Sequence, residues 1–140
     1  MRFEKSIDIN ASPQRVWEIV SGIEAWPQRI GTVDTIKVLT APPIDTGTQV
    51  RLQQPKLPDG IWEINVWDVP LYFEWTQKQN GVTSVAGHRV DSLGELRARL
   101  TLTLDMSGLL VPLIGLFYKN LTNEYMDREA EDIRRAAESS

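Results

Sequence analysis

Residues 71–90 read LYFEWTQKQNGVTSVAGHRV, and this stretch decides how the strands of the protein are paired. Asn80-Gly81 is the strongest turn signal in the chain, because both residue types tolerate the positive φ of a two-residue type I′ turn. A turn at this position fixes the register of the two strands that flank it. The predicted pairs are Gln79 with Val82, Trp75 with Ala86 and Phe73 with His88.

This register separates the hairpin into an apolar face and a polar face. The opposite face carries Glu74, Lys78 and Arg89 among other polar residues, so the apolar face is expected to face the core. His88, the single histidine of the chain, then points inward. The apolar face consists of Leu71, Phe73, Trp75, Ala86, His88 and Val90.

The segment 96–104 alternates leucine or alanine with arginine or threonine and predicts the next strand. A three-residue loop at Ser92 to Gly94 pairs His88 with Ala98 and Ala86 with Leu100. A loop one residue longer or shorter would turn the arginines inward, at a prohibitive cost. Small residues beside an inward imidazole leave space in a close-packed interior, so we expect a pocket there.

The strand before the hairpin, residues 61–67, admits two registers. If Val69-Pro70 forms the loop, Trp62, Ile64 and Val66 face inward. If Asp68 belongs to the loop, the inward residues are Glu63, Asn65 and Trp67. Hydrophobicity favours the first register, while the second would bring two polar side chains to the pocket.

The flanking segments supply helices. A first strand from Phe3 to Ile9 is followed by Ser12-Pro13, a capping hydroxyl and a proline that together indicate a helix start. A second short helix is expected over Ile23 to Ile30, six strands between Val33 and Leu104, and a long helix over Pro112 to Ala137. This order predicts an α+β fold in which a seven-stranded curved antiparallel sheet wraps the long helix. One stripe of that helix reads Leu110, Ile114, Phe117, Tyr118, Leu121 and Tyr125.

Composition limits the possible functions. A chain of 140 residues with a net charge of -4 predicts one domain, residues 1–140, and no nucleic-acid partner. The absence of cysteine and the single histidine argue against disulfides, a metal site and a cofactor. The charged N-terminus shows no export signal, and the apolar run from Leu109 to Phe117 is about half the length of a membrane span. A cytoplasmic location is therefore expected.

The order of elements, together with several motifs, resembles the START-like (SRPBCC, helix-grip) superfamily. The motifs are SIDINASPQRVWEIVSGIEAWPQRIGTVDTIKVL at 6–39, FEWTQ at 73–77, GHRV at 87–90 and LTLTLDMSGLL at 100–110. The chain looks most like the polyketide cyclase/dehydrase and lipid-transport group, over essentially its whole length. Relatives commonly have an aspartate after the first helix, where this chain has Gly22-Ile23-Glu24. The resemblance implies a cavity between sheet and long helix that relatives use for lipids, polyketides, hormones and quinones.

Two classes of function remain open. The first is a binding module for an apolar or aromatic small molecule. The second is a cyclase- or dehydratase-type enzyme with His88 as general acid or base; its weakness is that the sequence shows no partner to orient the imidazole. A module of the same fold without a cavity, serving protein interaction, is a weaker third possibility. The candidate ligand-binding residues are Phe73, Trp75, Ala86, His88, Ala98, Leu100, Phe117, Tyr118, Leu121 and Tyr125.

The acidic and basic run DREAEDIRR at 127–135 can be a docking surface, but runs of this kind are more often a solvated helix face with charge pairs at helical spacing. We predict the solvated face.

Overall fold

The computed structural model describes residues 1–139, which form one sheet, three α-helices and a short 3-10 helix. The elements follow the order β1 (Arg2–Ile9), α1 (Pro13–Ser21), η1 (Ile23–Ala25), α2 (Trp26–Arg29), β2 (Thr35–Val38), β3 (Gln49–Gln53), β4 (Gly60–Asp68), β5 (Tyr72–Gln79), β6 (Val82–Gly94), β7 (Arg97–Ser107) and α3 (Val111–Glu138).

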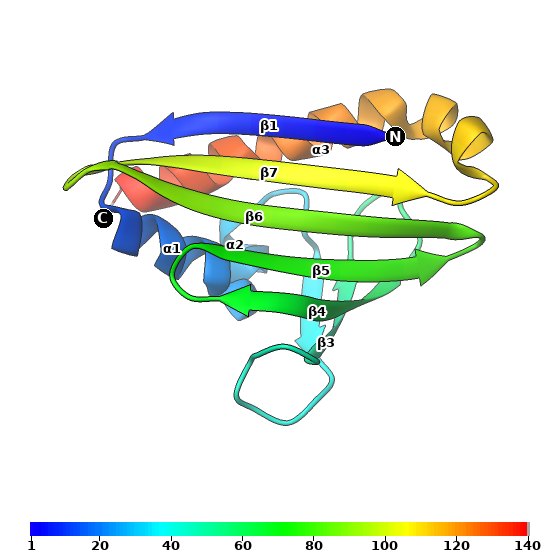
Figure 1. Ribbon diagram of the computed structural model, residues 1–140, viewed down its shortest axis with the longest axis horizontal. Coiled ribbons are helices and arrows are strands. Elements are labelled where there is room, and N and C mark those ends of the chain that lie inside the picture. The colour runs from blue at the N-terminus through cyan, green and yellow to red at the C-terminus, as the bar shows by residue number, and fades with distance from the viewer. Residues whose placement is uncertain (140) are drawn as a thin grey trace.

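All seven strands belong to one antiparallel sheet with the order β1-β7-β6-β5-β4-β3-β2. The helices lie on one side of this sheet, and α3 runs along β1 and β7 (Figure 1). The predicted helix-grip architecture of a curved sheet around a long C-terminal helix is confirmed.

The short helices begin where the sequence predicts. The Ser12 hydroxyl accepts a hydrogen bond from the backbone N–H of Arg15, and Pro13 occupies the first turn of α1. The second helical segment is split into η1 and α2, and Pro27 is tolerated because it lies in the first turn of α2. These helices bury Trp26 in the hydrophobic core.

The register of the β5–β6 hairpin is as predicted: Gln79 pairs with Val82 and Phe73 with His88, around an Asn80 with a φ of 53°. Because this turn fixes which side chains face the core, His88 does point inward, and 3% of it is exposed.

The predicted register between β6 and β7 is wrong by four residues. The strands do not end at Ser92 but continue to Gly94, so His88 pairs with Leu102 and Ala98 pairs with Ser92. The turn falls at Glu95 and Leu96 instead. Because a shift of four residues is even, the leucine face and the histidine face still coincide, and only the neighbours of His88 change.

Strand β4 contains a β-bulge that neither predicted register includes. Ile64 pairs with Trp75 and Val66 with Glu74, so Asn65 is an extra residue on this strand. A bulge resets the alternation of side chains. Trp62 and Ile64 face inward before the bulge and Trp67 faces inward after it, so each register is correct for one half of the strand.

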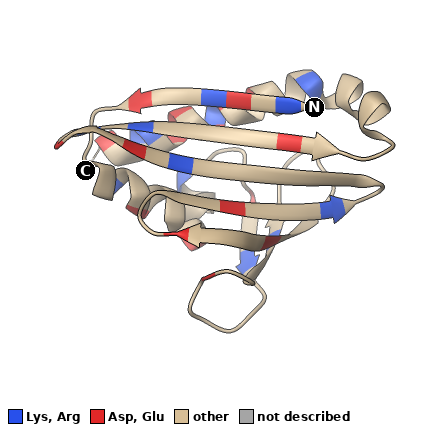
Figure 2. Ribbon diagram, in the orientation of Figure 1, with Lys and Arg blue, Asp and Glu red and all other residues tan. Residues whose placement is uncertain are grey.

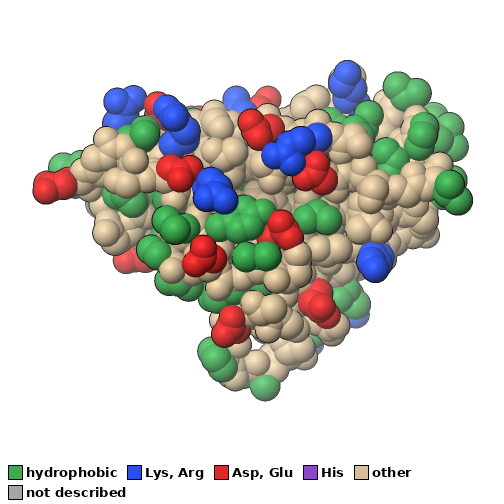
Figure 3. Space-filling view, viewed as in Figure 1, with side chains coloured by type: hydrophobic (Ala, Val, Ile, Leu, Met, Phe, Trp, Pro, Cys, Tyr) green, Lys and Arg blue, Asp and Glu red, His purple; other side chains and the backbone are tan. Residues whose placement is uncertain are grey.

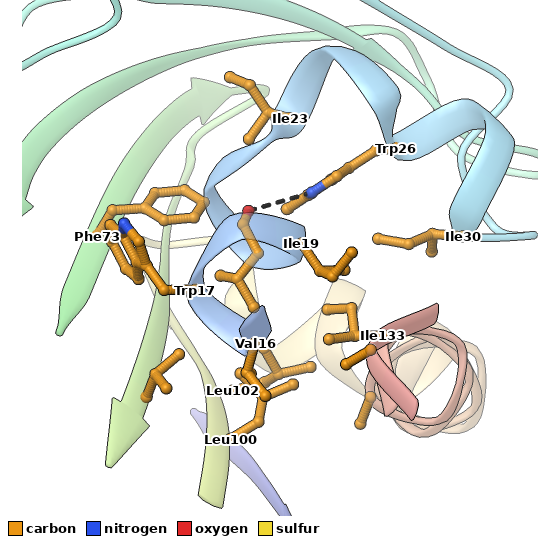
Figure 4. Close-up of a cluster of buried hydrophobic side chains, with 14 of the residues drawn as sticks. Val16, Trp17, Ile19, Ile23, Trp26, Ile30, Phe73, Leu100, Leu102 and Ile133 are labelled. Carbon is orange, nitrogen blue, oxygen red and sulfur yellow. Dashed lines mark hydrogen bonds between the residues drawn. The ribbon is translucent and has the colours of Figure 1, made fainter. Parts of the chain in front are cut away.

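The hydrophobic core lies at the end of the molecule where α1, α2 and the second half of α3 meet the sheet. Val16, Ile19 and Trp26 pack between Phe73 of the sheet and Ile133 of α3 (Figure 4). The indole N–H of Trp26 donates to the carbonyl of Val20 at 3.2 Å, which satisfies its buried polar atom. This end is filled with side chains.

The convex face of the sheet is polar. Lys, Arg, Asp and Glu alternate along its strands (Figure 2), with ion pairs such as Arg99 to Asp8 at 2.8 Å. Exposed apolar side chains gather instead near the start of α3, at the right of Figure 3, where Leu116 and Phe117 are 76% and 83% exposed. Within residues 1–139, none of the helices combines the length and apolar character needed to span a membrane.

Candidate functional site

A cavity of about 400 Å³ lies between the sheet and the α3 segment from Ile114 to Glu129. Space remains here because this part of β6 carries small residues, Ser84 and Ala86, opposite the helix, and no side chain of α3 fills the gap they leave. The core side chain Trp26 forms part of its wall, so the cavity extends from the filled end of the molecule toward the loop before β4.

His88 is held rigidly at the cavity wall. Its ring stacks on Phe73, with centroids 4.0 Å apart and planes 7° from parallel, and meets the ring of Trp75 edge-on at 5.6 Å. The Nδ1 atom lies 3.3 Å from the carbonyl oxygen of Phe73. Because a carbonyl oxygen can only accept, Nδ1 carries the proton in the neutral ring and Nε2 presents a lone pair.

Glu129 of α3 faces His88 across the inner end of the cavity, and its Oε2 atom is 3.9 Å from His88 Nε2. This separation exceeds a direct hydrogen bond. Among residues 1–139, the Glu129 carboxyl has no hydrogen-bond partner, although only 18% of its side chain is exposed. The Glu129 carboxyl therefore faces His88 and the open space of the cavity.

Burial shifts the pKa values of the two groups in opposite directions. Desolvation lowers the pKa of His88 to about 4, against a smaller opposing effect of the hydrogen bond to Phe73. Desolvation raises the pKa of Glu129 to about 7. Near neutral pH, His88 is therefore a neutral acceptor at Nε2 and Glu129 exchanges between acid and carboxylate. The pair can accept one proton and donate another.

The remaining walls are apolar and aromatic on the inside and carry amides and hydroxyls toward the loop. Trp26 and Trp75 contact each other edge-on at 5.3 Å beside His88. At the other end, the Tyr125 hydroxyl donates to the carbonyl of Pro55, and Gln79 donates to the carbonyl of Asp59 at 3.0 Å. These two bonds tie the loop between β3 and β4 to both α3 and the sheet.

The structure places only part of the predicted ligand-binding set on the cavity wall. The residues that line it are Trp75, Ala86, His88, Tyr118 and Tyr125. Phe73 lies one layer beneath, stacked under His88. Ala98 and Leu100 are fully buried in the core away from the cavity, because the longer β6 and β7 strands pair them with Ser92 and Val90.

Phe117 and Leu121 also lie outside the cavity wall. Ile114, Tyr118 and Tyr125 of the predicted stripe do line the cavity, together with Thr122. The stripe was predicted mainly from apolar side chains, whereas a cavity wall tolerates polar side chains that a filled core would exclude.

Glu129 is the cavity-lining acidic residue that sequence reasoning missed. It lies in the charged run 127–135, which was predicted to be a solvated face. The spacing along the helix could have identified it. Glu129 follows Met126 by three positions and precedes Ile133 by four, which puts it on the same inward side of the helix. Elsewhere in the run the prediction agrees with the structure, since Arg134 pairs with Glu131 and Glu138 on the helix surface.

A metal ion has no evident ligand set in the part of the chain that is described. Across residues 1–139, no three His, Asp or Glu side chains gather as a metal ion would require. The side chains that line the cavity offer hydrogen bonding, proton exchange and aromatic contact.

Comparisons with known proteins place these features in context. The family model described as polyketide cyclase / dehydrase and lipid transport matches residues 1–138, which confirms the resemblance seen in the sequence. No curated protein gives a significant match.

Solved structures share the fold at low sequence identity. The Zhui aromatase/cyclase from Streptomyces sp. R1128 superposes with a TM-score of 0.81 at 15% identity, covering 99% of this chain and 93% of its own. A START superfamily protein from Mycobacterium smegmatis has a TM-score of 0.78 at 21% identity, with 99% and 97% covered. Norcoclaurine synthase from Thalictrum flavum, in complex with dopamine and hydroxybenzaldehyde, has a TM-score of 0.76 at 13% identity, with 96% and 84% covered.

Proposed function

Because the chain belongs to the polyketide cyclase/dehydrase and lipid transport family, we propose that it binds an apolar or aromatic small molecule between the sheet and α3. The observation that carries this proposal is the cavity of about 400 Å³, whose volume falls in the range of small-molecule sites. Lipid, polyketide and quinone-like molecules match its apolar inner walls. The protein is proposed to hold its ligand without converting it.

The shape of the site supports binding in two ways. Trp26 and Trp75 provide flat apolar surface, and burying such surface contributes roughly 25 cal/mol per Å². The loop held by Tyr125 contributes Gln54, Leu57 and Pro58 to the other end of the cavity wall.

Native extraction tests this proposal. The protein is purified without denaturant, its bound small molecules are identified by mass spectrometry, and a variant with the cavity filled, Ala86→Trp, is treated identically. We expect an apolar or aromatic compound at near one equivalent with the wild type and its loss from the variant. The matched control is Ala136→Trp, at a partly buried alanine outside the cavity wall. A compound retained equally by all three proteins is surface contamination and contradicts the proposal.

A second candidate function is acid–base catalysis on the bound molecule, and the observation that favours it is Glu129 beside His88. Nε2 of His88 can take a proton from a ligand while protonated Glu129 returns one, which is the pattern needed for cyclisation or dehydration. Turnover of the extracted compound by the wild type, abolished in His88→Ala, would establish this function. An unchanged compound carried by both proteins supports simple binding.

A further inference from the structure

The gap between His88 and Glu129 has the size of one hydrogen-bonding atom. Nε2 and Oε2 are 3.9 Å apart, too far for a direct hydrogen bond, yet an oxygen about 2.8 Å from each would fit beside the line that joins them. Both residues line the cavity, so a bound ligand can reach the two atoms.

Both groups also lack a partner for the polar atom at this gap. The Phe73 carbonyl occupies Nδ1 and leaves Nε2 with an open lone pair, while the Glu129 carboxyl has no hydrogen bond within residues 1–139. Among residues 1–139 the fully buried side-chain polar atom without a partner is Thr32 Oγ1, so the two atoms at this gap are instead accessible from the cavity. Both can therefore hydrogen-bond a polar group of a bound ligand.

A hydroxyl satisfies this pair better than other small polar groups do. It donates to Nε2 and accepts from protonated Glu129, and if Glu129 is ionised it donates to the carboxylate instead. A carbonyl or ether oxygen only accepts, so it leaves Nε2 unpaired. A ligand carboxylate would meet Glu129 in a desolvated setting and be repelled.

The residues around the gap indicate the chemical character of the ligand that carries this hydroxyl. The Trp26 ring lies 5.7 Å from the His88 ring and the Trp75 ring 5.6 Å, and Ala86 and Leu102 complete an apolar wall around the gap. Building on the proposed small-molecule binding, we infer that this end of the cavity selects ligands with a hydroxyl on an aromatic or other apolar body, the hydroxyl bridging His88 Nε2 and the Glu129 carboxyl. Phenols and enols are the chemical class.

Isothermal titration calorimetry with three matched probes tests this inference: 2-naphthol, 2-methoxynaphthalene and naphthalene. The first donates and accepts, the second only accepts, and the third does neither. We expect 2-naphthol to bind the wild-type protein at least about tenfold more tightly than 2-methoxynaphthalene, because only the hydroxyl satisfies both protein atoms.

Two variants test whether the preference for 2-naphthol arises at Glu129. Glu129→Leu should reduce it to less than about threefold, whereas Glu129→Gln should keep it, because the amide still donates and accepts. The wild-type comparison does not depend on how either variant folds.

The outcomes separate the inference from the proposed function. Equal affinity of the wild type for 2-naphthol and 2-methoxynaphthalene overturns the inference and leaves binding intact, the gap then holding water alone. Failure of all three probes to bind contradicts the proposed aromatic site itself. A preference that persists in Glu129→Leu would assign the hydroxyl to a different position and also overturn the inference.

Discussion

His88 and Glu129 lie in the same apolar surroundings, which disfavour the charged form of each residue. For His88 the folded pKa is depressed from 6.5 to about 4, so the folded state loses stability as the pH falls through this window. For Glu129 the folded pKa is raised from 4.5 to about 7, so the folded state loses stability as the pH rises through that window. Between pH 4.5 and 6.5 the two effects oppose each other.

Glu129→Gln should remove the contribution of Glu129 to this pH dependence of stability. The variant has no carboxyl to protonate, so its free energy of unfolding relative to wild type should rise as the pH increases from 4.5 to 7, by about 3 kcal/mol at most. Urea denaturation at a series of pH values measures the difference. A parallel pair of stability curves would contradict a raised pKa of Glu129 in the folded protein.

Sequence reasoning reached one member of this pair. The direction of His88 could be predicted because the two-residue Asn80-Gly81 turn fixes the register of the hairpin. Alternation along β6 then gives the face on which His88 lies. The placement of Glu129 could not be predicted with the same ease, because a charged residue is assigned to solvent unless a specific cavity is known to receive it. Contacts between residues far apart in the sequence, and not local propensity, determine where Glu129 lies.

Among the structural elements, β4 shows how one extra residue changes a strand. The bulge at Asn65 lets Trp62 and Ile64 face inward on one side and Trp67 on the other, while the Asn65 side chain stays outside and bonds with Glu74 and Thr76. If the same sequence were paired without a bulge, one of these apolar groups would face water.

Deleting Asn65 should therefore cost less than about 1 kcal/mol, because the remaining residues alternate regularly and Trp62, Ile64 and Trp67 keep facing inward. Deleting Glu63 is the matched contrast: whether or not the bulge persists, either Trp62 or Ile64 must then turn outward, at a cost of at least about 3 kcal/mol. Chemical denaturation of both variants gives the comparison, and similar losses for the two would contradict this role of the bulge.

The strands themselves were predictable, while two irregularities within them were not. The Asn80-Gly81 turn has a strong local code, so its register followed directly. The bulge at Asn65 and the late turn at Glu95 and Leu96 depend on how whole strands pack against the helices, and each has several local solutions of similar cost.

At the scale of the whole molecule, α3 serves two different purposes along its length. Its second half carries Ala130, Ile133 and Ala137, all buried against α1 and the sheet. Its first half has the cavity on one side and solvent on the other, and Phe117 packs on neither the core nor the cavity wall. One continuous helix therefore joins a filled end to a hollow end.

Amide hydrogen exchange should distinguish these halves. Residues 113–122 should exchange at least about tenfold faster than residues 130–137, because fewer buried contacts are lost when the first half opens. Mass spectrometry of peptides from the two halves measures the rates in one sample, so each half is the reference for the other. Uniform protection along α3 would show that the helix opens as a single unit.

The architecture could be predicted from the order of elements, since one long helix and one sheet must bury their apolar faces against each other. The outline of the cavity could not, because it depends on which side of α3 meets the sheet. That choice moved Phe117 and Leu121 off the wall and brought Thr122 and Glu129 onto it.

The tryptophans also give the protein an optical property. Trp26 and Trp62 each lie within 6 Å of Trp75, at 5.3 and 5.8 Å, and Trp17 lies 5.9 Å from Trp67, with Phe73 between the two groups. Excitation absorbed by one indole at such separations passes to its neighbours before it is emitted. A single quencher resting on Trp75 would therefore dim emission from several indoles at once, and the coupled rings should give the empty cavity a distinct near-ultraviolet circular dichroism signature.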